Sequence, residues 1–219
     1  MSAPLLVFLG DIFFMAKDLS EMLRLADADD LQAVLATKIE QNRDAIRRNF
    51  SVITGDDGLV RRVIERPRHV RNNLKGCGLY LFDLHVFDAV RRTPRTAMRD
   101  EYEITNAIQV MVEDGCRIKS ANVVEEDLNL TYPSDLLMVN LKQLRATGRD
   151  RHIGEDAEVI DLSRIRDSVL GRHTVVKRPI RIESPVIYDG TVVETERTIR
   201  NCVLTPTQVV QCAEVRIPA

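Results

Sequence analysis

The sequence predicts an α/β layer followed by a short left-handed β-helix. In the first two-thirds of the chain, strand-like apolar runs alternate with stretches that carry apolar residues at helical spacing, an order typical of an α/β fold with a mainly parallel sheet. After residue 146, aliphatic residues instead recur at intervals of 6, 6 and 5 residues, which is typical of a stacked coil. This change divides the chain into two predicted domains, 1–147 and 148–219.

The α/β domain is expected to begin with a strand. Residues 5–9 form a continuous aliphatic run, which predicts a strand buried on both faces. A helix is expected over 18–26, a second buried strand over 31–37, and a hairpin whose strands flank the turn GDDG within 50–64. The later elements expected are a strand at 78–82, an amphipathic helix at 85–92, a helix at 105–114, a strand at 117–124 and a helix at 133–145 that begins with proline.

The coil is predicted from aliphatic residues that recur every 17 positions. The two clearest phases are Ile153, Leu170, Ile187 and Leu204, and Val159, Val176, Val193 and Val210. A coil with three flat sides would point one aliphatic residue inward from each side, and stacked coils would align these residues in a continuous column. Ordinary antiparallel strands would not keep the 17-residue spacing. Some acyltransferases use such coils, and His173 is the candidate histidine within them, but packing and oligomerisation are the expected role.

Composition excludes several classes of function. The net charge is −2 with 29% charged residues, a balance that gives no support for nucleic-acid or anionic-membrane binding. No apolar run approaches the roughly 20 residues that span a bilayer, and residues 1–14 lack the basic start of a signal peptide. Four cysteines without CxxC spacing predict reduced thiols and a cytoplasmic location.

Five short segments in the α/β part occur in a recognisable order. They are LGDIFF at 9–14, VIERP at 63–67, GCGLYLFD at 76–83, DEYEITN at 100–106 and DLNLTYPSDLL at 127–137. Together with the coil, they resemble the sugar-1-phosphate nucleotidylyltransferase family, which makes nucleotide sugars. The resemblance covers nearly all 219 residues. It implies a Rossmann-like nucleotidyltransferase layer followed by a hexapeptide-repeat β-helix, and the exposed end and flat faces of the last coil predict a homo-oligomer.

The resemblance implies a magnesium site and a catalytic role for Asp11. Asp11 and Asn129 fall at the two positions where the family holds Mg²⁺ against the nucleotide phosphates. Mg²⁺ prefers oxygen ligands and usually takes one or two from the protein, so a carboxylate and an amide carbonyl both suit it. A turn residue after a strand and a turn asparagine before a helix are the alternative interpretations.

The resemblance also implies a sugar-phosphate site. Glu65 would accept hydrogen bonds from sugar hydroxyls, and Arg66, where relatives carry lysine, would take a catalytic role by neutralising phosphate charge. Gly78 would let the sugar approach the backbone. Ser51 replaces a family glycine close to the sugar, and Glu101 belongs to the segment that leads into a helix near it. A surface ion pair at Glu65 and a tight turn at Gly78 are the alternatives.

The implied reaction is attack by a sugar-1-phosphate oxygen on the α-phosphate of an NTP, with release of pyrophosphate. The family's G-x-G-T-R loop, which grips the triphosphate, has no match in this chain. We therefore expect an N-terminally incomplete layer with an exposed sheet edge, and no pyrophosphate release by this chain alone.

Three interpretations of the missing loop stay open. A second polypeptide supplies the front half of an enzyme, or an upstream coding sequence does. Alternatively, the chain is a non-catalytic regulatory or assembly subunit that retains a sugar-phosphate site. The sequence selects neither the nucleotide nor the sugar.

Overall fold

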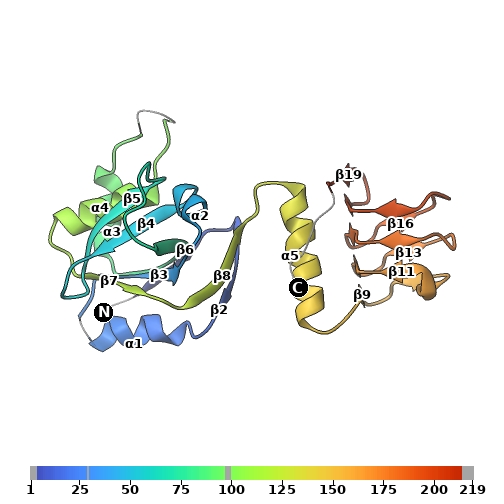
Figure 1. Ribbon diagram of the computed structural model, residues 1–219, viewed down its shortest axis with the longest axis horizontal. Helices are drawn as coiled ribbons and strands as arrows, with labels where there is room; N and C mark the ends of the chain where they lie inside the picture. Colours follow the sequence, from blue (N-terminus) through green and yellow to red (C-terminus); the bar gives the residue numbers. More distant parts are fainter. Residues whose placement is uncertain (1–3, 29, 97–99, 214–219) are drawn as a thin grey trace. The chain divides into compact units, whose positions relative to one another are not determined.

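The computed structural model describes residues 4–28, 30–96 and 100–213. The chain divides into two compact units, Met1–Asp127 and Leu128–Ala219. The first unit is an α/β layer and the second is a β-solenoid with one helix (Figure 1). Within the described residues, no helix has the length and apolar character needed to cross a membrane.

The first unit is built around one sheet. Within the described residues its strand order is β5-β4-β6-β3-β7, and β1 pairs with β6. The elements are β1 (Leu5–Phe8), β2 (Ile12–Ala16), α1 (Ser20–Ala28), β3 (Ala33–Ile39), α2 (Arg43–Arg47), β4 (Phe50–Thr54), β5 (Val60–Glu65), β6 (Leu74–Phe82), α3 (His85–Arg92), α4 (Ile104–Glu113), β7 (Ile118–Ala121) and β8 (Val124–Asn129), which runs into the second unit.

The expectation of a mainly parallel sheet is wrong. In the described part of the β5-β4-β6-β3-β7 sheet, β3 and β7 are the one pair that runs parallel, whereas β6 runs antiparallel to β1, β3 and β4. β6 is the longest strand and touches three others, so its direction determines most of the pairings. The strand expected over 117–124 is two strands, because the chain turns where the Val123 N–H donates to the Ala121 carbonyl at 2.9 Å.

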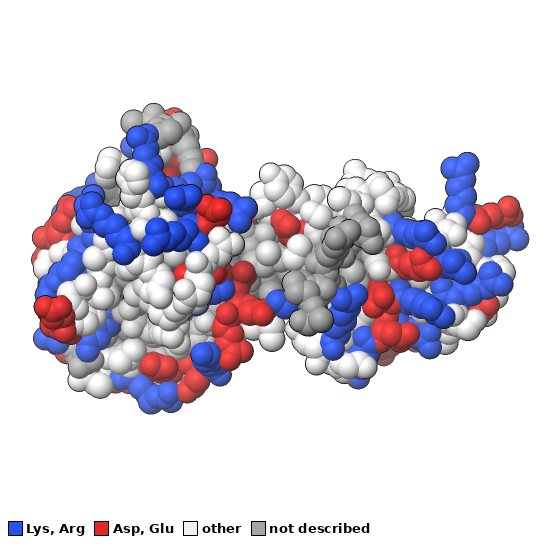
Figure 2. Space-filling view, viewed as in Figure 1, with Lys and Arg blue, Asp and Glu red and all other residues white. Residues whose placement is uncertain are grey.

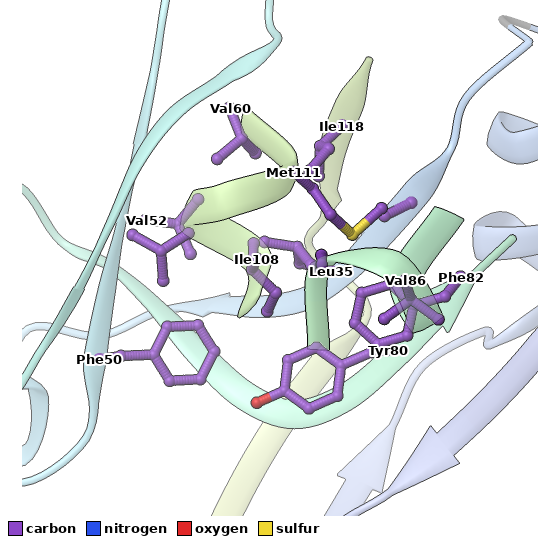
Figure 3. Packing of buried hydrophobic residues seen from close by; sticks show 13 residues of the cluster. Leu35, Phe50, Val52, Val60, Tyr80, Phe82, Val86, Ile108, Met111 and Ile118 are labelled. Atoms are coloured by element: carbon purple, nitrogen blue, oxygen red, sulfur yellow. The ribbon is translucent and has the colours of Figure 1, made fainter. Parts of the chain in front are cut away.

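Helices cover both faces of the sheet because β3 and β6 point apolar side chains to either side. Leu35 faces a cluster with α3 and α4, and its neighbour Val34 faces a cluster with α1. Figure 3 shows the first cluster, in which the Tyr80 ring stacks with those of Phe50 and Phe82 at centroid distances of 6.2 and 5.6 Å. The predicted helices in this unit are confirmed as α1, α3 and α4.

β1 differs from the strand that the sequence predicts. A strand buried on both faces was expected, but Leu6 and Phe8 are 49% and 51% exposed. The reason is that β1 pairs only with β6 within the described residues, so it forms an edge of the sheet. The expected exposed edge is therefore present at β1.

The second unit begins with α5 (Pro133–Ala146), followed by short strands. These elements are β9 (Arg151–Ile153), β10 (Glu158–Val159), the 3₁₀ turn η1 (Leu162–Arg164), β11 (Ile165–Arg166), β12 (Ser168–Leu170), β13 (Val175–Val176), β14 (Ile182–Glu183), β15 (Val186–Ile187), β16 (Val192–Val193), β17 (Ile199–Arg200), β18 (Cys202–Leu204) and β19 (Val209–Gln211).

The 17-residue repeat is confirmed by the strand register. Residues one repeat apart are parallel partners, such as Ile165 with Ile182 and Ile182 with Ile199. The inward aliphatic residues form one buried column, which includes Leu170 and Ile187. Figure 2 shows acidic and basic side chains interleaved over the coils, where Arg200, Lys177 and Arg172 pair with acidic residues, namely Glu183, Glu194 and Asp189.

The repeat ends earlier than predicted. Val210 was expected to continue its column, but β19 folds back antiparallel to β18 and places Val210 opposite Val203. The Thr205 N–H donates to the Gln208 carbonyl at 2.9 Å, which closes a tight turn around Pro206 and reverses the chain.

α5 packs on the outside of the coils. Leu137 and Leu141 lie in one buried cluster with Val186, and Val169 packs against it. The helix therefore belongs to the same compact unit as the solenoid. The domain boundary predicted after residue 147 stays a prediction.

Candidate functional site

The turn that carries Asp11 lies over Gly78. Asp11 is exposed between β1 and β2. A β-carbon at Gly78 would lie 2.4 Å from Ile12 Cδ1 and 3.1 Å from Leu9 Cδ1. Gly78 has a φ of +68°, which glycine adopts readily. The structure thus brings the first and third sequence segments together, and two aliphatic side chains fill the space above Gly78.

Glu65 ends β5 and has two neighbours that suit a carboxylate. Thr105 Oγ1 of α4 donates to Glu65 Oε2 at 3.2 Å, and Arg66 Nε lies 3.8 Å from Glu65 Oε1. Arg66 has a φ of +43°, and its N–H donates to the Asn49 carbonyl at 2.7 Å. The second and fourth segments therefore meet here, with Arg66 exposed beside a half-buried Glu65.

Ser51 belongs to the strand beside Glu65. β4 pairs with β5 so that Phe50 lies opposite Glu65. The buried Ser51 donates its hydroxyl to Asn72 Oδ1 at 2.7 Å, and Asn72 Nδ2 donates to the Val52 carbonyl at 2.6 Å. Ser51 therefore fixes the loop before β6, and its predicted effect on a sugar pocket stays a prediction.

A network of four charged side chains lies in the same unit. Lys38 and Lys75 are cross-strand partners on β3 and β6, a placement in which like charges repel. Asp127 of β8 bridges them: one carboxylate oxygen pairs with Lys75 Nζ, and the other lies 3.4 Å from Lys38 Nζ. Glu40 Oε2 lies 3.1 Å from Lys38 Nζ. Two anions thus balance two cations.

Burial and nearby charges shift the pKa values of groups in and around the network. Burial opposes ionisation of Glu40, but the Asn42 N–H and Lys38 outweigh it and hold the pKa of Glu40 below its ordinary value. Burial raises the pKa of the Cys77 thiol to about 12, and the Asp127 carboxylate adds to the rise. Burial, and then the Glu65 carboxylate, raise the pKa of Tyr80.

The structure places Asn129 and Glu101 but does not assign their roles. Asn129 is the last residue of β8, is partly buried, and belongs to the second compact unit. Glu101 is exposed, and its carbonyl accepts a hydrogen bond from the Thr96 N–H at 2.9 Å. Their metal and substrate roles stay predictions.

The exposed carboxylate of Asp11 suits Mg²⁺. Asp11 is exposed and forms no ion pair within the described residues, so its carboxylate can accept a cation. No cluster of three or more His, Cys, Asp or Glu side chains suited to a metal occurs in the part of the chain that the structure describes. Mg²⁺ needs no such cluster when water and phosphate complete its shell.

Sequence reasoning did not single out the charged network. Its members come from three separate segments of the chain, and 52 positions separate Lys75 from Asp127. The available signal was Lys75 itself, a lysine in the otherwise apolar strand LKGCGLYLF. A buried strand that contains lysine requires a buried carboxylate.

Comparisons with known proteins agree with this architecture. The low-salt glycan biosynthesis nucleotidyltransferase of Haloferax volcanii is 31% identical over 135 residues, which are 61% of this chain and 36% of that protein. The UTP–glucose-1-phosphate uridylyltransferase AglF of the same organism is 29% identical over 130 residues, 59% of this chain and 52% of AglF. The bifunctional protein GlmU of Clostridium novyi is 22% identical over 208 residues, 91% of this chain and 43% of GlmU.

A solved structure of UDP-glucose pyrophosphorylase in complex with UDP-glucose shares the fold. Its TM-score is 0.55 at 17% identity, over 67% of this chain and 57% of that one. The chain spans between about a third and a half of the length of the three relatives. The family model for nucleotidyl transferases matches residues 1–127. This chain therefore belongs to the nucleotidyl transferase family.

Proposed function

We propose that this chain takes part in nucleotide-sugar biosynthesis, by transfer of a nucleotidyl group from an NTP to a sugar-1-phosphate with release of pyrophosphate. The observation that carries the proposal is the meeting of Glu65, Arg66 and Thr105 in a chain of the nucleotidyl transferase family. A carboxylate that accepts hydroxyl groups beside an exposed guanidinium matches the two ends of a sugar phosphate.

The proposed roles follow from the placement of each side chain. Glu65 accepts hydrogen bonds from the sugar hydroxyls, as it already does from Thr105. Arg66 neutralises charge on the phosphate, and Glu101 lies in the segment that leads to Thr105. Gly78 lies under the Asp11 turn, so sugar contact at this glycine requires Leu9 and Ile12 to move.

The proposal includes a magnesium ion. Asp11 would supply one ligand, and Asn129 a second by family resemblance. When bound, Mg²⁺ would supply positive charge that offsets the negative charge of the phosphates. The residues of this chain would hold the sugar phosphate and the metal, which is positioning rather than covalent chemistry.

We further propose that the triphosphate-binding part comes from a second polypeptide. The part that these relatives share with this chain is 36–52% of their length, so about half or more of each relative lies outside it. A cytoplasmic location and a homo-oligomer built through the solenoid remain predictions of the same account.

A pyrophosphate-release assay tests the transferase activity. The substrates are glucose-1-phosphate with UTP or dTTP and MgCl₂, and the protein is the full chain, alone and with the part of AglF outside its aligned residues. We expect no turnover by the chain alone, turnover by the pair, and loss of turnover with Glu65→Gln. Glu21→Gln on α1 is the control, because Glu21 is an exposed glutamate on a different element.

A non-catalytic subunit that binds sugar phosphates is the second candidate. The filled space above Gly78 favours it, because Leu9 and Ile12 occupy the room that a sugar would need. Binding of glucose-1-phosphate without turnover in any combination would support this candidate and contradict the transferase.

A further inference from the structure

A hollow on one flat face of the solenoid is lined mainly by charged side chains. The face is the parallel sheet β11-β14-β17, whose first strand is labelled in Figure 1, and the hollow has a volume of about 330 Å³. The residues that line it are Ser163, Arg164, Arg166, Arg181 and Glu183. Small-molecule sites have volumes of roughly 300–1,000 Å³, so the hollow has room for a compact polar ligand.

The 17-residue repeat places charged side chains of this face in register. Arg166, Glu183 and Arg200 are successive parallel partners on β11, β14 and β17, and neighbouring strands lie roughly 4.7–4.9 Å apart. The preceding residues, among them Ile165 and Ile182, are buried in the aliphatic column. Because side chains alternate along a strand, the charged side chains project away from the column.

Glu183 balances only part of the positive charge around it. Its Oε2 lies 2.8 Å from Arg200 Nε, and its Oε1 lies 3.6 Å from Arg181 Nε. Arg164 Nε donates to Asp161 Oδ2 at 2.9 Å. These contacts join three guanidinium groups to two carboxylates, which leaves an excess of positive charge.

Arg166 adds a guanidinium group that has no acidic partner. Its side chain is exposed and forms no ion pair or hydrogen bond within the described residues. The acid that follows it in the chain, Asp167, lies 3.8 Å from Arg145 of α5 instead. The hollow and its ion pairs thus contain four guanidinium groups and two carboxylates, an excess of two positive charges.

Hydrogen bonds hold the 3₁₀ turn η1 beside the hollow. Arg151 Nη1 donates to the carbonyls of Leu162 and Ile165 at 2.8 and 3.1 Å. The Ser163 N–H donates to Asp161 Oδ1 at 3.0 Å, and its hydroxyl donates to the same oxygen at 2.6 Å. The backbone on this side of the hollow is therefore ordered before a ligand arrives, which lowers the entropic cost of binding.

The excess charge indicates the chemistry of a ligand. At pH 7 a phosphate monoester has a charge of about −1.5 to −2, which matches the two positive charges that no carboxylate balances. A carboxylate ligand would balance one of them. The planar guanidinium group also donates two parallel N–H···O bonds to phosphate oxygens.

We propose that this hollow binds the phosphate group of a small phosphorylated molecule. Arg166 makes the main contact, because no carboxylate competes for it, and Arg164 and Arg181 add contacts from η1 and from the next coil. A sugar phosphate and inorganic pyrophosphate are the two sources of such a group. The lining residues belong to the second compact unit and Glu65 belongs to the first, and the proposal does not rest on the proposed function.

The test is a titration of the full, isotope-labelled chain, followed by NMR of the arginine Nε–H groups. Inorganic pyrophosphate and glucose-1-phosphate are added separately at pH 7 without divalent cations, and the probe that binds more tightly identifies the source. We expect saturable shifts of Arg164, Arg166 and Arg181. Sodium chloride at the same ionic strength should not produce them.

Three substitutions distinguish this site from general attraction by charge. Arg166→Gln should weaken binding by at least about tenfold, because hydrogen bonds between charged groups are the strong ones. Lys177→Gln is the matched control and should leave binding unchanged, because Lys177 is an exposed cation of another face that already pairs with Glu194. Glu65→Gln should also leave binding unchanged.

Glu183→Gln should produce a gain that a loss of folding cannot imitate. Glutamine keeps the size of the side chain but removes the carboxylate that pairs with Arg181 and Arg200. Both guanidinium groups then become available to the ligand. Binding should become about two- to fivefold tighter, which is the size of the contribution of an exposed ion pair.

Several outcomes would overturn the proposal. They are the absence of saturable shifts, equal weakening by R166Q and K177Q, weaker binding by E183Q, and loss of binding in E65Q, which would assign the ligand to the site proposed for nucleotidyl transfer. A chain that binds with the predicted pattern but releases no pyrophosphate in the transferase assay supports the phosphate site and contradicts only the transferase proposal.

Discussion

Lys75 and Asp127 form a buried ion pair that ties β8 to the central sheet. Their side chains are 4% and 1% exposed, and 52 positions of sequence separate them. Asp127 also lies within 3.4 Å of Lys38, so one carboxylate holds two lysines that would otherwise repel each other. Loss of either partner leaves a charge in a site that water does not reach.

We predict that Lys75→Met destabilises the first unit by about 3–5 kcal/mol, because Asp127 then loses its buried partner. Arg61→Met is the control, since Arg61 and Asp57 form an exposed pair of the kind that contributes about 0–1 kcal/mol. The measurement is hydrogen exchange of β3 and β6 amides as urea is raised. Equal effects of the two substitutions would show that burial does not determine how much the ion pair contributes to stability.

Glu40 should make the stability of the first unit depend on pH. The pKa of Glu40 is below its ordinary 4.5 in the folded chain, so its ionisation stabilises the fold above about pH 4.5 and this contribution is lost as pH falls through the folded pKa. Glu40→Gln should therefore be less stable than wild type at pH 7, and the difference should shrink in acid.

Lys38→Met provides the control for the Glu40 prediction, because Lys38 is the cation 3.1 Å from the Glu40 carboxylate. In that background Glu40→Gln should have a smaller effect at pH 7. Urea midpoints measured from pH 3 to pH 7 compare the four chains. A difference between E40Q and wild type that grows in acid would contradict the predicted sign.

Alanine substitutions at Gly78 and Gly148 distinguish the cost of backbone strain from the cost of steric overlap. Both have a φ of +68°, but a β-carbon at Gly148 would meet nothing within 4 Å, whereas one at Gly78 would overlap Ile12. Alanine in this backbone region costs about 1–2 kcal/mol. Gly148→Ala should show that cost alone, and Gly78→Ala a larger one that Ile12→Ala partly relieves. Urea unfolding measures the free-energy cost of both substitutions. Equal costs would show that the Asp11 turn does not lie over Gly78.

Removal of the Tyr80 hydroxyl, unlike the preceding substitutions, is not expected to lower stability. Its hydroxyl is buried and has no hydrogen-bond partner within the described residues. A polar group buried without a partner lowers stability by about 1–3 kcal/mol, so Tyr80→Phe should leave the free energy of unfolding unchanged or raise it. The ring contacts with Phe50 and Phe82 remain in this variant. A loss of more than about 1 kcal/mol would reveal a partner for the hydroxyl.

Much of the fold could be predicted because its signals are local. The 17-residue repeat fixed the parallel register of the coils, and the amphipathic stretch at His85–Arg92 coincides with α3. The direction of β6 and the exposure of β1 depend on which strands meet, and residue periodicity contains no such information. The end of the solenoid was missed because Val210 keeps the apolar phase while the turn before it reverses the chain.

The candidate site was predictable only in part for the same reason. Motifs located Glu65 and the Thr105 segment separately, and the structure adds their hydrogen bond. The aliphatic cover over Gly78 and the Lys75–Asp127 pair arise from contacts between distant segments. A pattern along the chain could identify the residue types but not these distances.

Titration calorimetry of the full chain with glucose-1-phosphate in MgCl₂ tests the central claim most directly, that this chain contributes a sugar-phosphate site at Glu65. The account predicts saturable binding that Glu65→Gln weakens by at least about tenfold, since a hydrogen bond to a charged group contributes about 1.5–3 kcal/mol, and that Glu21→Gln leaves unchanged. The absence of binding by the wild-type chain, or equal binding by E65Q and wild type, would contradict it.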